Sequence, residues 1–277
     1  QCLVGSEMCI RDRDKRLQPV TVMYIIQNVD ESKAITCVGE EDEVKIGGER
    51  FLEFTARCCK EGILPENCYC VRLYRTTYEG ERLVNTTQVN YVDPLDRKQI
   101  LEADQELRHQ MNIITDFLRK YVPGYEHCTI KTGASTLGIR ESRRFSGKYV
   151  MNISDLREAR RFPDVVVHKA QFVVDIHNPV GGGQANGIAE YVDAYDIPWR
   201  SLVPQKMENL ILAGRCISGT HEAMASYRVM AIAMAIGEAA GIGAALAIDH
   251  DVTPENLDVK YIQKALMDKG AVLFDEK

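Results

Sequence analysis

The chain has 277 residues and a formal net charge of −6 at neutral pH, with 45% hydrophobic and 27% charged residues. This balance is typical of a globular protein with a substantial core, and the acidic surplus argues against a nucleic-acid-binding protein, which needs a basic face. A membrane helix needs roughly 18 consecutive apolar residues, and several glycines and Glu238 interrupt the longest apolar segment, residues 229–248. We therefore expect a soluble protein with neither a nucleic-acid nor a membrane partner.

Nine cysteines occur at irregular positions: 2, 9, 37, 58, 59, 68, 70, 128 and 216. Their odd number and the length of the chain favour reduced thiols and a cytoplasmic location. Four of them lie within "CCKEGILPENCYC" (58–70), but zinc and iron–sulfur ligands usually come as Cys-x-x-Cys, and no such pair occurs. We predict no metal site, with a site in this cluster as the minor alternative.

The first thirteen residues, "QCLVGSEMCIRDR", show no periodicity, and the composition changes abruptly at Asp14. They look like translated sequencing-adaptor sequence, so we expect residues 1–13 to be a non-native leader that should be left out of reasoning about the fold. On this reading the natural N-terminus and any signal peptide are missing, and the chain is a fragment.

Strands and one long helix are predicted next. Residues 20–26 are rich in β-branched residues and predict a strand, and "CYCVRLYRTT" and "RLVNTTQVNYV" predict two more, joined by "YEGE" as a hairpin. Asp93 and Pro94 predict the N-cap and first position of a helix that ends before Pro123. Its apolar stripe is Ile100, Ala103, Leu107, Met111, Ile114, Leu118 and Tyr121.

Polar residues and glycines dominate the middle of the chain. "TGASTLGIRESRRFSGKYVM" carries Arg140, Arg143 and Arg144 close to Glu141, and Ser154-Asp155 predicts the start of a short helix. "AQFVVDIHNPV" predicts a strand with Asp175 and His177 on one face. The glycine-rich loop that follows, "GGGQANG", lacks the spacing of a dinucleotide-binding motif.

The C-terminal part opens with a short apolar strand, residues 210–213, of the kind that a parallel sheet covered on both faces requires. It ends at Gly214 and Arg215, which suit a strand end where a ligand approaches the backbone. A helix rich in Ala and Gly follows, and we attribute its Gly241 and Gly243 to close packing. A second, amphipathic helix is predicted from Thr253 to Lys269.

Four motifs in this order, "LGIRESRRFSGKYV", "DIHNP", "IPWRSLVP" and "NLILAGRCISGTHEAMASYRVMAIAMAIGEAAG", resemble bacterial FAD-dependent oxidoreductases of the glutathione-reductase structural superfamily. The resemblance is greatest to the heterodisulfide-reductase-subunit-A-like group, some of whose members are labelled xanthan lyases. It extends over most of residues 14–277.

The resemblance implies an α/β (α+β overall) fold. Residues 14–197 would form an inserted β-rich substrate or cap domain with a long helix. Residues 198–250 would form the C-terminal portion of a Rossmann-type FAD/NAD(P)-binding domain, followed by a helical tail, residues 251–277.

The resemblance also implies the cofactor FAD. Gly214 and Arg215 would border its ribityl and pyrophosphate groups, and the backbone of Val229, Met230 and Ala231 would face the pyrimidine edge of the flavin at a helix N-terminus. The Gly-x-Gly-x-x-Gly unit of this superfamily is missing from the sequence. A 4Fe–4S cluster rests on the family label alone, because no cysteine spacing fits its ligands.

The function implied is hydride transfer to FAD from an unidentified small-molecule donor, with this fragment inactive by itself. His221 and His177 are candidate bases, and Arg143 is a candidate clamp for a carboxylate or the flavin phosphate. The alternatives are a locally hydrogen-bonded loop histidine, a strand-end histidine satisfied by backbone, and a solvated or ion-paired arginine. Cys216 is expected to be a small buried thiol.

A different function class also stays open: a non-catalytic binding module, or an electron-transfer flavoprotein subunit with an iron–sulfur partner. The sequence does not indicate the oligomeric state.

Overall fold

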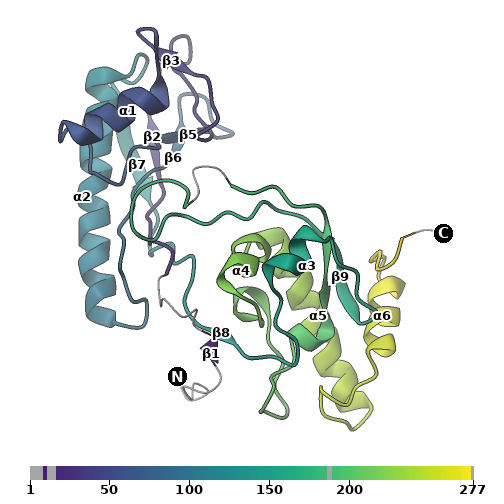
Figure 1. Cartoon of the computed structure of the whole chain (residues 1–277). Coiled ribbons are helices and arrows are strands. Elements are labelled where there is room, and N and C mark those ends of the chain that lie inside the picture. The colour runs from purple at the N-terminus through teal and green to yellow at the C-terminus, as the bar shows by residue number, and fades with distance from the viewer. Residues whose placement is uncertain (1–8, 11–16, 186–188, 276–277) are drawn as a thin grey trace. The chain divides into compact units, whose positions relative to one another are not determined.

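The computed structural model describes residues 9–10, 17–185 and 189–275 (Figure 1). Its described residues form two compact units. Unit 1 contains residues 9–10, 143–176 and 189–275, and unit 2 contains residues 17–142 and 177–185. Each unit therefore draws on separate stretches of sequence, and each has its own hydrophobic core.

The unit boundaries cut across the predicted domains. Residues 143–176 and 189–197, which we placed in the substrate domain, pack with the C-terminal residues in unit 1. The functional roles of the domains stay a prediction. Of the predicted leader, only Cys9–Ile10 is described; it forms β1, which pairs with β8 (Arg144–Phe145), and the other leader residues lie outside the described ranges.

Unit 2 is built on a four-stranded antiparallel sheet with strand order β5-β6-β2-β7. Its strands are β2 (Tyr24–Gln27), β5 (Arg72–Arg75), β6 (Arg82–Asn85) and β7 (Thr129–Gly133). The predicted hairpin is confirmed, because β5 and β6 pair directly with Leu73 opposite Val84. Both of these side chains are fully buried, as the alternation along a half-buried strand requires.

The long helix of unit 2 is α2 (Arg97–Tyr121) (Figure 1). Five residues of the predicted apolar stripe are buried and its two end residues, Ile100 and Tyr121, are partly buried. The start of the helix was predicted three residues too early. Asp96 is the N-cap and its side chain accepts hydrogen bonds from the backbone of Lys98 and Gln99, whereas Asp93 accepts one from Leu95. The rest of unit 2 consists of β3 (Lys45–Ile46), β4 (Glu49–Arg50) and α1 (Phe51–Lys60).

An ion pair ties the inner strand β6 to the loop after β2. The fully buried guanidinium of Arg82 donates two hydrogen bonds, of 2.6 and 2.8 Å, to the carboxylate of Glu31. This contact lowers the pKa of Glu31 to about 2. The carboxylate is therefore ionised over the whole physiological pH range, and the buried charge of Arg82 is compensated.

Unit 1 combines short strands with helices. Its elements, besides β1 and β8, are α3 (Ile153–Arg157), β9 (Val165–Ala170), β10 (Tyr195–Pro198), the 3₁₀ turns η2 (Trp199–Ser201) and η3 (Gly214–Cys216), α4 (His221–Tyr227), α5 (Met230–Asp249) and α6 (Val259–Asp268). β9 and β10 pair antiparallel, and α5 lies against β9, α6 and η3 (Figure 1).

Two strand predictions are wrong. Residues 210–213 and 171–177 belong to none of the described strands, and every named strand pair is antiparallel. Leu212 is buried and its N–H donates to the carbonyl of Leu202, but Ala213 is exposed. A strand needs a neighbouring strand for its ladder of hydrogen bonds, and an apolar run alone does not supply one.

Two helix starts also differ from prediction. Asn152, and not Ser154, is the N-cap of α3, where it forms a reciprocal capping box with Asp155. α6 begins at Val259 with Asp258 as its N-cap, although Thr253-Pro254 has the composition of a helix start. The carbonyl of Pro254 instead accepts a hydrogen bond from the indole of Trp199.

Helix α5 packs closely on one side only. A Cβ atom at Gly243 would lie 2.3 Å from the Trp199 ring, so close packing explains this glycine. A Cβ at Gly237 or Gly241 would meet nothing within 4 Å, so the same explanation is wrong for Gly241. On its exposed side α5 carries large apolar side chains: Met230, Met234 and Ile248, which are 84%, 74% and 80% exposed.

By length and composition alone, α5 is long and apolar enough to cross a membrane, with a third of its apolar window buried. A single helix of this kind is weak evidence for a membrane span, because the core helix of a soluble protein meets the same criteria. In the structure α5 contacts β9 and η3.

We expect opposite effects from two alanine substitutions in α5. Gly243→Ala should destabilise the protein by about 1–3 kcal/mol, because the added methyl group overlaps Trp199. Gly241→Ala should stabilise it by about 0.5–1 kcal/mol through helix propensity. Trp199 is the only tryptophan, so its fluorescence during urea unfolding reports both changes; equal effects of the two substitutions would contradict the packing described.

Candidate functional site

The loop from Gly214 to Thr220 carries two of the predicted cofactor-binding residues. Gly214 opens η3 with φ of 72°, a backbone conformation that favours glycine, and a Cβ there would meet nothing within 4 Å. Arg215 is exposed, and η3 lies against both β8 and α5. A glycine is therefore needed at position 214 for its backbone conformation, and not because a neighbouring group is close. The space beside its Cα is open.

The N-terminus of α5 carries the other three predicted cofactor-binding residues. α5 begins at Met230 with Val229 as its N-cap, as predicted, and Val229 makes no side-chain capping hydrogen bond. The first N–H groups of a helix have no acceptor within the helix, and the side chains of Met230 and Ala231 are exposed. This end of α5 thus offers backbone N–H donors and a partial positive charge.

Arg228, immediately before this N-terminus, was not singled out from the sequence. Its guanidinium donates to the backbone carbonyl and the carboxylate of Asp175, at 3.0 and 2.6 Å. Both side chains are largely buried. The pair ties the residue before the α5 N-cap to the segment after β9. Arg228 lies within the longest of the four family motifs, but its pairing with Asp175 is visible only in the structure.

The candidate catalytic residues are distributed over both units. His221 is the first residue of α4, with Thr220 as N-cap, and so lies in a helix rather than the predicted loop. Arg143 is half-buried and precedes β8 in unit 1. His177 is buried in unit 2, where its backbone N–H donates to the side chain of Gln18. No strand holds His177 and Asp175 on one face, and they belong to different units.

Cys216 is half-exposed and not buried as predicted. Its thiol lies 3.2 Å from the carbonyl of Ala213, and it is a free cysteine.

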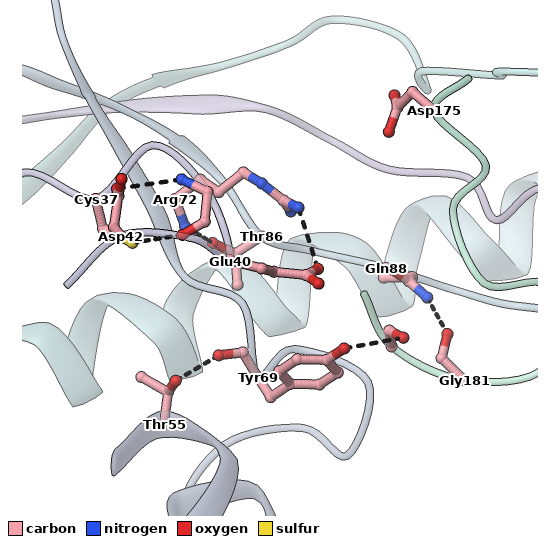
Figure 2. A network of polar contacts seen from close by, with 12 residues as sticks. Cys37, Glu40, Asp42, Thr55, Tyr69, Arg72, Thr86, Gln88, Asp175 and Gly181 are labelled. Atoms are coloured by element: carbon pink, nitrogen blue, oxygen red, sulfur yellow. Dashed lines mark hydrogen bonds and ion pairs between the residues drawn. The ribbon is translucent and has the colours of Figure 1, made fainter. Parts of the chain in front are cut away.

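Unit 2 contains a second concentration of polar side chains (Figure 2). Arg72 and Glu40 form an ion pair at 3.4 Å, and both side chains are nearly nine-tenths buried. The backbone carbonyl of Tyr69 accepts a hydrogen bond from Thr55, and its hydroxyl donates to the carbonyl of Gly182 at 3.5 Å. Burial raises the pKa of Tyr69, so its hydroxyl stays protonated and available as a donor at neutral pH.

The glycine-rich loop packs against this group of residues. The side-chain amides of Gln88 and Asn90 both donate to the carbonyl of Gly181. A Cβ at Gly183 would lie 1.8 Å from the Tyr69 hydroxyl and 2.8 Å from a carboxylate oxygen of Glu40. Gly183 therefore permits close approach of the loop to the Tyr69 side chain.

A protein-family model for FAD dependent oxidoreductases matches residues 4–266. The chain belongs to this family. No curated protein and no solved structure matches the chain. The family match begins at residue 4, within the predicted leader, so the leader stays a prediction. The mixture of helices and strands in the structure is consistent with the α/β FAD-binding domain of an FAD-dependent oxidoreductase.

The residues at Gly214 and at the start of α5 fit part of an FAD molecule. The open space at Gly214 accepts a group close to the backbone, and the exposed guanidinium of Arg215 suits an anionic one. The N–H groups at the start of α5 suit an acceptor edge that gains negative charge. The 277-residue sequence contains no Gly-x-Gly-x-x-Gly motif for the pyrophosphate.

The 4Fe–4S cluster has no support beyond the family label. Burial raises the pKa of Cys59 to about 11 and that of Cys68 and Cys70 to about 12, so these free thiols are protonated at neutral pH. Across residues 17–185 and 189–275, the structure shows no group of three or more His, Cys, Asp or Glu side chains placed to hold a metal ion.

We expect Gly183→Ala to destabilise unit 2 by about 1–3 kcal/mol, because the methyl group overlaps the Tyr69 hydroxyl and the residue has φ of 65°. Gly181→Ala is the matched control and should change stability by less than about 0.5 kcal/mol, because its methyl group meets only the flexible amide of Asn178.

Thermal unfolding of both variants, alone and with Tyr69→Leu, measures these effects. Removal of the Tyr69 ring should reduce the cost of Gly183→Ala. A cost that stays the same in the Tyr69→Leu background would show that the ring is not what selects glycine.

Proposed function

We propose that this chain forms the flavin-ring side of the FAD site in an FAD-dependent oxidoreductase that takes a hydride from a small-molecule donor. The observation that carries the proposal is the uncapped N-terminus of α5, at Val229, Met230 and Ala231, within the matched family segment. When bound, FAD supplies the two-electron chemistry that amino-acid side chains lack.

The N–H groups at the start of α5 would bind the acceptor atoms of the flavin pyrimidine edge. A helix N-terminus carries roughly half a positive charge, and it stabilises the negative charge that reduction places on this edge. Arg215 would bind a pyrophosphate oxygen, and Gly214 would let the cofactor approach the backbone. Arg215 is exposed, and the first N–H groups of α5 have no acceptor within the helix.

The proton that accompanies hydride transfer requires a base near the donor. We propose His221 for this role, because it lies in the same unit as the flavin-binding residues, at the start of α4. Arg143, which is also in unit 1, would orient an anionic donor. His177 lies in unit 2, and we assign it no role in this site.

We further propose that a Gly-x-Gly-x-x-Gly unit outside these 277 residues binds the pyrophosphate. One feature supports this. The exposed side of α5 is apolar, and large exposed apolar surfaces on soluble proteins mark interaction sites.

The seven cysteines whose side chains the structure describes are free thiols. This supports a reducing compartment, the cytoplasm, as the location of the enzyme.

The 277-residue chain should bind FAD weakly, because it lacks a pyrophosphate-binding motif. The longer protein that includes one should purify yellow, with the visible absorbance bands of bound flavin. Absorbance spectra of the longer protein and fluorescence titration of the chain with FAD test this. A folded but colourless longer protein contradicts the proposed function, and tight FAD binding by the chain alone contradicts the need for an additional unit.

Arg215→Met should weaken FAD binding by the longer protein about tenfold or more, because a charge-assisted hydrogen bond to the pyrophosphate is lost. Arg157→Met is the matched control. Arg157 is an exposed arginine of the same unit, and its guanidinium binds Glu190. Isothermal titration calorimetry measures the affinity of both variants for FAD. Equal affinities would show that Arg215 does not bind the cofactor.

A further inference from the structure

The residues assigned to FAD and to the base are joined by a buried loop, residues 217–220. Gly214 and Arg215 precede it in η3, and His221 follows it in α4. Ile217 and Ser218 are fully buried, and Gly219 is buried as well. The conformation of this loop therefore sets where the residues at both of its ends lie.

One side of the loop is held by Arg144, which is only 2% exposed although it carries a permanent charge. Its Nε donates a hydrogen bond of 2.8 Å to the carbonyl of Gly219. Burying a guanidinium costs free energy unless it is well hydrogen-bonded. An apolar residue would fill this position at lower cost, so the use of an arginine points to a requirement for its directed donors.

The other side of the loop is held by Tyr227, which is fully buried at the end of α4. Its hydroxyl donates to the carbonyl of Ile217 at 3.2 Å. A Cβ at Gly219 would lie 2.6 Å from the same hydroxyl, so the Tyr227 ring leaves room only for glycine at this position. Tyr227 is also two residues before Val229, the N-cap of α5, and so links the loop to the second group of flavin-binding residues.

We propose that Arg144 and Tyr227 are positioning residues that fix the 217–220 loop and thereby set the environment of the flavin. The inference rests on the proposed function, because FAD is the ligand whose contacts the loop would align. Neither residue touches the cofactor in this proposal; both act through the backbone carbonyls of Gly219 and Ile217.

The first measurement needs no flavin. In the 277-residue chain, the amides of Ser218 and Thr220 donate to Ser201 and Met151, and they should be slow to exchange with deuterium. Arg144→Met should raise their exchange rates about tenfold, the effect of one lost hydrogen bond of ordinary strength. Arg144→Lys should raise them less, and Arg157→Met should leave them unchanged. Unchanged exchange in Arg144→Met overturns the proposal.

The second measurement uses the flavin-bearing longer protein, where a merely structural residue would leave the flavin unaffected. Arg144→Met and Tyr227→Phe should both shift the visible spectrum and the midpoint potential of the bound flavin, with Arg144→Lys closer to the wild type. Tyr227→Phe removes one oxygen and keeps the ring. It therefore still tests the positioning role if Arg144→Met fails to fold.

The outcomes separate the two proposals. A yellow wild-type protein whose variants keep its spectrum and potential overturns the positioning role alone. A colourless wild-type protein overturns the proposed function, and the positioning role falls with it.

Discussion

The arrangement of unit 1 depends on one constraint: the backbone groups of the 217–220 loop are buried and must find hydrogen-bond partners inside the protein. They find them in two segments distant in sequence. Ser218 donates to Ser201 and accepts from Met151, and Thr220 donates back to Met151. Gly147 allows the approach, because a Cβ there would lie 2.7 Å from the Cβ of Ser218. η2, the segment after β8 and the start of α4 are thereby fixed together, and the candidate flavin-binding residues are carried by this assembly.

The glycines of this protein show how one residue type serves different physical purposes. Gly183 and Gly243 make room for an aromatic side chain, Gly214 adopts a positive φ in open space, and Gly241 meets nothing within 4 Å. In the sequence these positions look alike, and a close-packing explanation for the glycines of α5 is right for Gly243 and wrong for Gly241. Only the neighbours contributed by the rest of the fold distinguish the cases.

Features encoded by local periodicity could be predicted from the sequence. The apolar stripe of α2 and the β5–β6 hairpin follow from patterns within a few turns or strands. The start of α5 at Met230 was implied by the family resemblance. Helix starts were displaced where several capping residues compete, as Asp93 and Asp96 do before α2. The prediction of a strand at residues 210–213 failed because a strand forms only beside a neighbouring strand, which a distant part of the sequence must supply. For the same reason Arg144 and Tyr227 could not be ranked above other polar residues, since their role lies in contacts with a distant loop.

The two sides of α5 connect the fold to the proposed cofactor site. One side is fixed by Ile232, Ile236 and Gly243 against the core of unit 1, and the other presents Met230, Met234 and Ile248 to solvent. Burying one large apolar side chain is worth about 1.5–3 kcal/mol, so a pyrophosphate-binding unit that covered this side would gain several times that amount. The same contact would hold the unit beside the N-terminus of α5, where the flavin ring is proposed to bind. Domain association and cofactor binding would then stabilise each other, because each brings together surfaces that the other also requires.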